Sequence, residues 1–298
     1  MTQTPQPMDE YVDEGPDRSA EARLRRLTQR VATGLPLALA AAALIWAGPF
    51  PFALLVLLFA LFGVSEVYDL TEFKGFRPAR RTGAAATILI VLGAYFLDDG
   101  CLAHVVLLCV VASLVLFVFR SPQRVSALVD GSTTIMGFLY CGWLPAHFIL
   151  LRKLESLPAG TEASLVTGAG LVTWLVTLCA ATDVGAYFVG KALGRTKLCP
   201  QVSPGKTVEG ALGGLILATL IGWYLGRWFG IAPAHCLTLA ILGSLTAQVG
   251  DLWESALKRD VGVKDSGNLI EGHGGVLDRF DSYFLAAPVF YLYVTWFM

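Results

Sequence analysis

The chain has 298 residues and a formal net charge of −1, and 55% of its residues are hydrophobic while only 15% are charged. Its mean hydropathy is +0.62, and several apolar runs reach the roughly 20 residues that a helix needs to cross a bilayer. These values exclude an ordinary soluble protein and predict an all-α polytopic integral membrane protein. The small net charge says little, because in membrane proteins the distribution of charge matters more than its sum.

A polar tail precedes the first apolar run. Residues 1–30 are rich in Pro, Asp, Glu and Gln and become basic from Arg23 onward, which predicts a partly disordered cytoplasmic tail rather than a cleavable signal peptide. The basic end fits either a flank that orients the first span or a short interfacial helix, and we favour the flank.

Nine apolar segments follow the tail and predict about nine transmembrane helices. They cover residues 31–48, 50–68, 83–97, 102–119, 132–151, 165–189, 210–226, 235–250 and 283–298. With the N-terminus in the cytoplasm and the C-terminus outside, 19 of the 22 Lys and Arg residues lie on the inner side, and only Arg152, Lys153 and Arg227 lie outside. This positive-inside bias supports the nine-span topology.

The same scheme divides the chain into three regions. These are the tail 1–30, N-terminal membrane helices within 31–164, and a C-terminal catalytic region 165–298 with cytoplasmic loops 190–209 and 251–282. The six cysteines are scattered, mostly within apolar runs and without a CxxC pair, so we expect them to be small core residues rather than disulfides or zinc ligands. The sequence shows no convincing internal repeat, which disfavours an inverted-repeat transporter.

Two features of the C-terminal region are ambiguous taken alone. Asp183 lies within the sixth predicted span, where an ionisable side chain is costly, so it is either a structural hydrogen-bond partner or a metal or substrate contact. The segment Ser203–Thr207, SPGKT, is not a P-loop, because Pro200 stands where the first glycine would be. It is either a turn and helix cap or a phosphate site formed by its hydroxyls, Lys206 and a helix start.

The most polar stretch of the chain is Gly250–Ser282, between the last two spans. Asp251 and Glu254 are three residues apart, as are Asp278 and Asp281. If each pair extends the adjacent span as helix, each places two carboxylates on one face, and two such faces together would suit Mg²⁺. The basic residues between them suit phosphate.

Two further sets of polar residues are weaker candidates. His273, flanked by glycines, fits a metal ligand, an acid/base group or a loop hydrogen-bond partner equally well. Glu66, Asp69 and Glu72 lie at the inner end of the second span, and we interpret them as a polar edge at the membrane interface.

These residues together resemble the signature of the phosphatidate cytidylyltransferases, also called CDP-diacylglycerol synthases. The resemblance covers residues 180–282, and Glu271 is its one clear departure, since the family usually has Pro, Gly or Ser there. The matching segments are Asp183-x-Gly185-Ala186-Tyr187, Ser203-Pro204-Gly205-Lys206-Thr207, Gln248-x-Gly250-Asp251-Leu252, Ser255-x-Leu257-Lys258-Arg259, Lys264-Asp265-x-Gly267 and His273-Gly274-Gly275-x-x-Asp278-Arg279-x-Asp281.

The resemblance implies transfer of the cytidylyl group of CTP to phosphatidic acid, with one or two Mg²⁺ ions, at the cytoplasmic face of the inner membrane. The catalytic residues it implies are Asp251, Asp278, Lys258, Arg259 and Lys264. The substrate phosphates would be held by Ser203, Lys206, Lys258, Arg259, Lys264, Arg279 and His273. The metal ligands would be Asp251, Asp278, Asp281, Glu254 and Asp183.

We also expect membrane lipids to reach the site through a hydrophobic cleft near Asp183, and no nucleic acid to bind. A homodimer is implied by the resemblance alone. The alternatives are a CTP-using lipid kinase, a CDP-alcohol phosphotransferase and a cation transporter. The length of the Ser255–Asp281 pattern disfavours the kinase, and the sequence has no DGxxAR run for the phosphotransferase. Because the acids gather at one face beside bases, a cation path across the bilayer is also disfavoured.

Overall fold

The computed structural model describes residues 36, 38–119, 126–154, 167–267 and 274–298, and in these ranges the protein is almost entirely helical. The predicted tail 1–30 lies outside the described residues. A short helix, Ala38–Ala47, comes first. It is followed by α2 (Pro49–Phe73), α3 (Arg80–Phe96), α4 (Asp99–Phe119), α5 (Ala127–Phe138), the π-helix η2 (Leu139–Trp143), α6 (Leu144–Lys153), α7 (Gly168–Leu193), β1 (Lys197–Cys199), β2 (Ser203–Thr207), α8 (Val208–Trp228), α9 (Pro233–Val261) and α10 (Leu277–Phe297).

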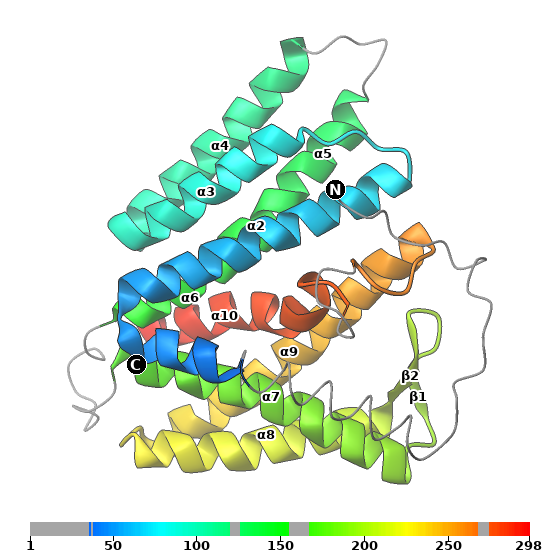
Figure 1. Ribbon diagram of the computed structural model, residues 1–298. Coiled ribbons are helices and arrows are strands. Elements are labelled where there is room, and N and C mark those ends of the chain that lie inside the picture. The colour runs from blue at the N-terminus through cyan, green and yellow to red at the C-terminus, as the bar shows by residue number, and fades with distance from the viewer. Residues whose placement is uncertain (1–35, 37, 120–125, 155–166, 268–273) are drawn as a thin grey trace.

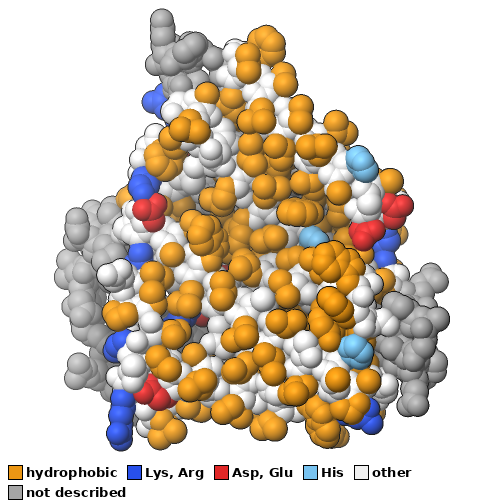
Figure 2. Space-filling model, turned by 180° about the vertical axis from the view of Figure 1, so that it is seen from behind, with side chains coloured by type: hydrophobic (Ala, Val, Ile, Leu, Met, Phe, Trp, Pro, Cys, Tyr) orange, Lys and Arg blue, Asp and Glu red, His pale blue; other side chains and the backbone are white. Residues whose placement is uncertain are grey.

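Six of the described helices are long and apolar enough to cross a membrane. They are α2, α4, the continuous segment Ala127–Lys153, α7, α8 and α9. Figure 2 shows hydrophobic side chains covering most of one face, with charged side chains gathered toward two opposite edges. Because water cannot satisfy polar groups inside a bilayer, this banded surface is typical of a protein that spans one. The multi-pass, helical prediction is therefore confirmed.

The helices form two groups around a shared centre. In Figure 1, α2, α3 and α4 occupy one side of the molecule, α7 and α8 the other, and α6, α9 and α10 lie between them. Glycines allow α7 and α8 to pack at close range: a Cβ added to Gly185 would lie 2.8 Å from the Gly213 carbonyl oxygen, and one added to Gly214 would lie 2.6 Å from that of Thr182. Small residues at such contacts are characteristic of membrane helix pairs.

The structure corrects one expectation about the polar segments and sharpens another. The all-α prediction missed a small antiparallel hairpin, in which Lys197 pairs with Thr207 and Cys199 with Ser203. The stretch 251–282, assigned above to a cytoplasmic loop, is helical at both ends, as its acid pairs suggested: α9 continues to Val261, where Gly262 ends it in the left-handed conformation with φ of 80°, and α10 begins at Leu277. Only glycine adopts such a φ without strain, so the helix end is fixed there.

Four of the six cysteines are buried and all six are free thiols: Cys109, Cys141, Cys179 and Cys236 are buried, Cys199 is partly buried and Cys101 is exposed. The prediction that the chain uses cysteine in its core without disulfides is thus confirmed for those four. Most of the buried residues form one core that extends from α2 to α10.

Candidate active site

Two crossing helices bring the predicted acids together. Asp251 and Glu254 lie on the C-terminal part of α9, and Asp278 and Asp281 lie in the first turns of α10. The two backbones meet at Gly250, where an added Cβ would lie only 2.4 Å from the Asp281 carbonyl oxygen. The prediction that both acid pairs continue their neighbouring helices is therefore confirmed, and glycine at 250 is what lets the helices approach.

Lys258 lies between one acid of each pair. Its Nζ is 2.5 Å from Glu254 Oε2, one turn earlier on α9, and 2.6 Å from Asp278 Oδ1 on α10. All three side chains are largely shielded from solvent, with Glu254 only 1% exposed. A buried charge is tolerated only when it is paired, so this lysine and its two carboxylates are mutually dependent.

Asp278 also organises the chain that leads into α10. Its Oδ2 accepts hydrogen bonds from the backbone N–H groups of Ser266, at 3.1 Å, and Gly275, at 2.8 Å. Gly274, with φ of 80°, makes the turn that allows this. The carboxylate is thereby fixed by two amides and one ammonium group, which leaves it little freedom to reorient.

The remaining acids form a second group. The carboxylate of Asp183 on α7 is close enough to interact electrostatically with Asp251 and with Lys206, and that of Asp281 with Asp251 and Asp183. Lys206 Nζ, from β2, lies 2.7 Å from Asp251 Oδ2. Three carboxylates from three helices therefore lie near one another, with Lys206 beside Asp251 and Asp183, and negative charge is in excess.

The first group consists of Glu254, Asp278 and Lys258, and the second of Asp183, Asp251, Asp281 and Lys206. Each helix of the α9–α10 pair contributes one acid to each group.

The structure also decides in part between the two interpretations of the SPGKT segment. It forms β2, Thr207 caps α8 by accepting a hydrogen bond from Gly210 N at 3.1 Å, and Lys206 reaches the acids.

The other predicted phosphate-binding residues are placed differently. Arg259 donates to the carbonyl oxygens of Val202, at 3.2 Å, and Val263, at 3.0 Å, and so ties the hairpin to the end of α9. Ser203 lies in β2, opposite Cys199. Lys264 and Arg279 are exposed. His273 and Glu271 lie outside the described residues.

Of the two groups, the second has the donor types that a hard divalent cation prefers. Within the described ranges, no three His, Cys, Asp or Glu side chains lie close enough in this conformation to hold a metal ion. The five predicted ligands do not form one cluster, because Lys258 satisfies Glu254 and Asp278. Asp183, Asp251 and Asp281 offer oxygen ligands of the kind that Mg²⁺ prefers, and Lys206 offsets only part of their charge.

One buried acid was missed by sequence reasoning. Glu66 on α2 is 7% exposed and contacts the segments on both sides of residues 268–273. The interpretation of Glu66 as part of a polar surface edge is therefore wrong, whereas Asp69 and Glu72 do pair with Arg80 near the surface, at 2.5 and 3.0 Å. An ionisable residue inside a predicted span was the signal that could have singled out Glu66.

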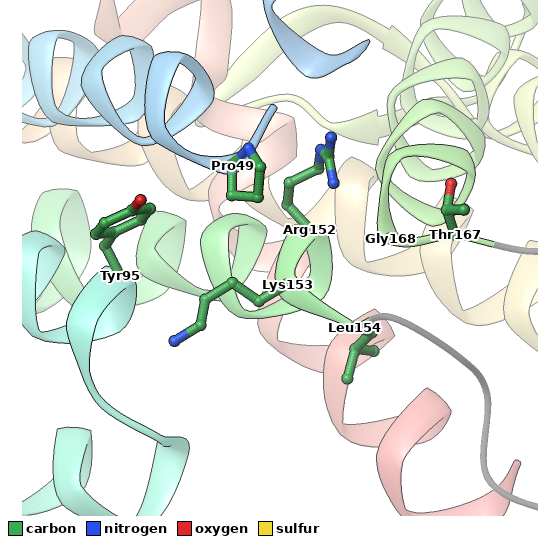
Figure 3. A pocket seen from close by; sticks show the side chains of 7 residues that line it. All are labelled: Pro49, Tyr95, Arg152, Lys153, Leu154, Thr167 and Gly168. Carbon is green, nitrogen blue, oxygen red and sulfur yellow. The ribbon is translucent and has the colours of Figure 1, made fainter. Parts of the chain in front are cut away.

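The structure contains two notable cavities. One, of about 500 Å³, lies at the end of the bundle away from the acids and is lined by Pro49, Tyr95, Arg152, Lys153, Leu154, Thr167 and Gly168 (Figure 3). Its two basic residues are engaged with backbone carbonyls, Arg152 with Ile45 at 2.7 Å and Lys153 with Leu97 at 2.6 Å. They therefore stabilise helix ends, and this cavity contains none of the predicted site residues.

The second cavity has a volume of about 600 Å³ and lies between the segment Ala127–Lys153 and α9–α10. It is almost wholly apolar and is lined by Ser132, Ile135, Met136, Leu139, Tyr140, Trp143, Leu144, Val249, Trp253 and Leu285. Tyr140 interacts electrostatically with Asp281, Glu254 and Asp251, and its hydroxyl has no hydrogen-bond partner among the described residues. The apolar cavity therefore adjoins Tyr140. The hydrophobic cleft for lipid entry was expected near Asp183 instead, and the Asp183 side chain is exposed.

Comparison with known proteins gives a consistent result. Residues 28–297 match the model of the cytidylyltransferase family. A phosphatidate cytidylyltransferase of Synechocystis is 37% identical over 289 residues, covering 90% of this chain and 96% of the relative. One from Bacillus subtilis is 32% identical over 279 residues, covering 91% and 98%. The chloroplastic phosphatidate cytidylyltransferase 5 of Arabidopsis thaliana is 32% identical over 308 residues, covering 95% and 75%.

Proposed function

The chain belongs to the cytidylyltransferase family, and we propose that the two groups of carboxylates and lysines between α7, α9, α10 and β2 are its catalytic centre. As a member of this family it is a membrane nucleotidyltransferase that converts CTP and phosphatidic acid to CDP-diacylglycerol and pyrophosphate. The observation that carries the proposal is the approach of Asp183, Asp251 and Asp281 to one another, with Lys206 paired to Asp251 and the buried Lys258 paired to Asp278 in the first group.

The reaction requires two anions to meet. A phosphate oxygen of phosphatidic acid attacks the α-phosphorus of CTP, and the bond from that phosphorus to the bridging oxygen of the pyrophosphate breaks. Positive charge must offset both the repulsion of the substrates and the charge that develops on the leaving group. Lys206 and Lys258 are held in place by carboxylates, so each is oriented before a phosphate arrives. The attacking phosphate is already ionised and needs no strong general base.

Mg²⁺ is the second source of positive charge in this proposal. Asp183, Asp251 and Asp281 would hold one or two ions, which would relieve the repulsion among the three carboxylates. When bound, the metal would polarise phosphoryl oxygens and stabilise the pyrophosphate. Lys206 would then be available to the phosphates of CTP, while Asp278 and Glu254 keep Lys258 in position.

We assign the apolar cavity beside Tyr140 to the acyl part of phosphatidic acid. It lies between the segment Ala127–Lys153 and α9–α10, and both Trp143 and Trp253 line it. Acyl chains in this cavity would place the lipid phosphate toward the acid groups, past the Tyr140 hydroxyl. That hydroxyl could donate a hydrogen bond to the lipid, which would satisfy a buried polar atom.

The proposal includes nine membrane crossings with the acids facing the cytoplasm of the inner membrane. The described helices support it in part: α3 and α10 would add two crossings to the six long apolar helices, and the ninth would be the predicted span 31–48, of which the structure describes the helix Ala38–Ala47. Because CTP does not cross membranes, inside-out vesicles should use added CTP and intact right-side-out vesicles should not. The reverse result would place the site on the other face. The homodimer implied by the family resemblance stays a prediction.

Two labelled forms of CTP test the reaction itself. Purified protein in detergent would be given phosphatidic acid, Mg²⁺ and CTP labelled with ³²P at either the α or the γ position. Label from the α position alone should enter the lipid, with release of pyrophosphate. Transfer from the γ position would instead indicate a kinase. No transfer from folded protein would refute the assignment of the enzymatic activity.

A further inference from the structure

We propose that Glu66, on α2, is a positioning residue for the catalytic centre, an inference that rests on the proposed function. Glu66 is 200 residues away from Ser266 in the chain, yet its Oε2 accepts a hydrogen bond from the Ser266 hydroxyl at 2.9 Å. Its two carboxylate oxygens also accept from Val276 N and Leu277 N, each at 2.8 Å. The N-terminal half of the protein is thereby tied to the start of α10.

The location of the carboxylate is chemically favourable. The first N–H groups of a helix have no partner within the helix, and Glu66 satisfies two of them at the start of α10. A negative charge there also complements the positive end of the helix dipole. Because Glu66 is only 7% exposed, water is poorly placed to replace it. Removing the carboxylate would leave buried donors unsatisfied, which costs more than the bonds themselves contribute.

Glycines at two positions make room for this carboxylate. A Cβ added to Gly275 would lie 2.5 Å from Glu66 Oε2 and 2.1 Å from Ser266 Oγ, and one added to Gly267 would lie 3.1 Å from Glu66 Oε1. Both glycines belong to the motif segments named above, so the contact with Glu66 gives a physical reason for glycine at these positions.

The same two segments also hold Asp278. The Ser266 hydroxyl donates to Glu66 while its backbone N–H donates to Asp278, and Gly275 N donates to Asp278. Glu66 and Asp278 thus accept hydrogen bonds from the same two segments. Since Asp278 in turn pairs with Lys258, loss of Glu66 should displace Asp278 and then Lys258, although the hydrogen bonds of Glu66 go to Ser266, Val276 and Leu277 and not to the lysine.

A matched control exists elsewhere in the chain. Asp130 is also a buried carboxylate, 4% exposed, and it accepts from the backbone N–H groups of Arg77, at 2.7 Å, and Ser126, at 2.9 Å. It ties the loop after α2 to the start of α5 and, among the residues that the structure describes, its carboxylate makes no hydrogen bond or ion pair with the catalytic centre. Replacing Asp130 therefore tests what the loss of a buried loop contact does by itself.

The experiment compares Glu66→Gln and Glu66→Ala with Asp130→Asn and Asp130→Ala. For each purified variant we would measure melting temperature, kcat and KM for both substrates well below the melting temperature, and hydrogen exchange of residues 263–267 and 274–277. We expect Glu66→Ala to lower kcat by about 10- to 100-fold, as the loss of supporting contacts around a site commonly does. Glu66→Gln should lose less, because its amide oxygen still accepts. Exchange should accelerate in both segments.

The Asp130 variants should melt at lower temperature with kcat within about twofold of wild type. Retention of wild-type kcat by both Glu66 variants would overturn the proposal, whatever their melting temperatures. If Glu66→Ala fails to fold, Glu66→Gln alone decides, by the same criterion. A wild type that transfers no label would refute the proposed function, whereas an active wild type with unaffected Glu66 variants would refute only the role of Glu66.

Discussion

Removal of the Lys258 ammonium group should destabilise the protein strongly. In Lys258→Met, Glu254 and Asp278 would face each other without the cation that now lies 2.5 and 2.6 Å from them. Breaking a buried ion pair by deleting one partner costs about 3–5 kcal/mol. At about 2–4 °C for each kcal/mol in a domain of this order of size, the melting temperature should fall by roughly 6–20 °C.

A second substitution tests the electrostatic cause. Glu254→Gln in the Lys258→Met background removes one of the two stranded charges, so it should recover about 1–3 kcal/mol of the loss, the usual range for coupled neighbours. Thermal unfolding of the wild type, Lys258→Met, Glu254→Gln and the double variant in detergent, followed by tryptophan fluorescence, measures the cycle. Lys258 is not the shared counter-charge if Lys258→Met has the same melting temperature as the wild type. The same conclusion follows if adding Glu254→Gln to Lys258→Met lowers the melting temperature further.

Three further substitutions probe the site. Asp278→Asn should abolish turnover while the amount of protein in membranes stays unchanged; substantial residual activity would remove Asp278 from the catalytic centre. Lys206→Ala should raise KM for CTP and lower kcat by roughly 10²-fold or more, and an unchanged KM for CTP would contradict its proposed role. Tyr140→Phe should raise KM for phosphatidic acid and leave KM for CTP alone in steady-state assays, and the opposite pattern would move the lipid site elsewhere.

The sequence was informative where local spacing decides the structure. Acids three residues apart beside apolar runs predict helical faces, and α9 and α10 do extend through Asp251, Glu254, Asp278 and Asp281. Spacing does not determine which acids meet across a helix crossing, since that depends on the rotation and depth of each helix. The structure pairs Glu254 with Asp278 through Lys258, a division that no pattern within one helix could specify.

The sequence was least informative about contacts between distant segments. Glu66 looks like one of three acids at the edge of a span, yet its partners are Ser266, Val276 and Leu277. The hairpin was also missed, because SPGKT has the composition of a turn, and its strand pairing depends on Lys197–Cys199 across the turn. The Glu66 contacts arise from tertiary packing between distant segments, whereas the hairpin depends on the pairing of two neighbouring short strands whose composition does not favour a strand.

The most direct test of the catalytic centre is transfer of the α-labelled cytidylyl group by wild type and Asp251→Asn across a range of Mg²⁺ concentrations. Asp251 faces Lys206 and interacts with both Asp183 and Asp281. The wild type should label the lipid with an absolute dependence on Mg²⁺, and Asp251→Asn should not label it at any concentration. An Asp251→Asn protein that transfers label at the wild-type rate, with the same dependence on Mg²⁺, would contradict the assignment of this cluster as the site of cytidylyl transfer.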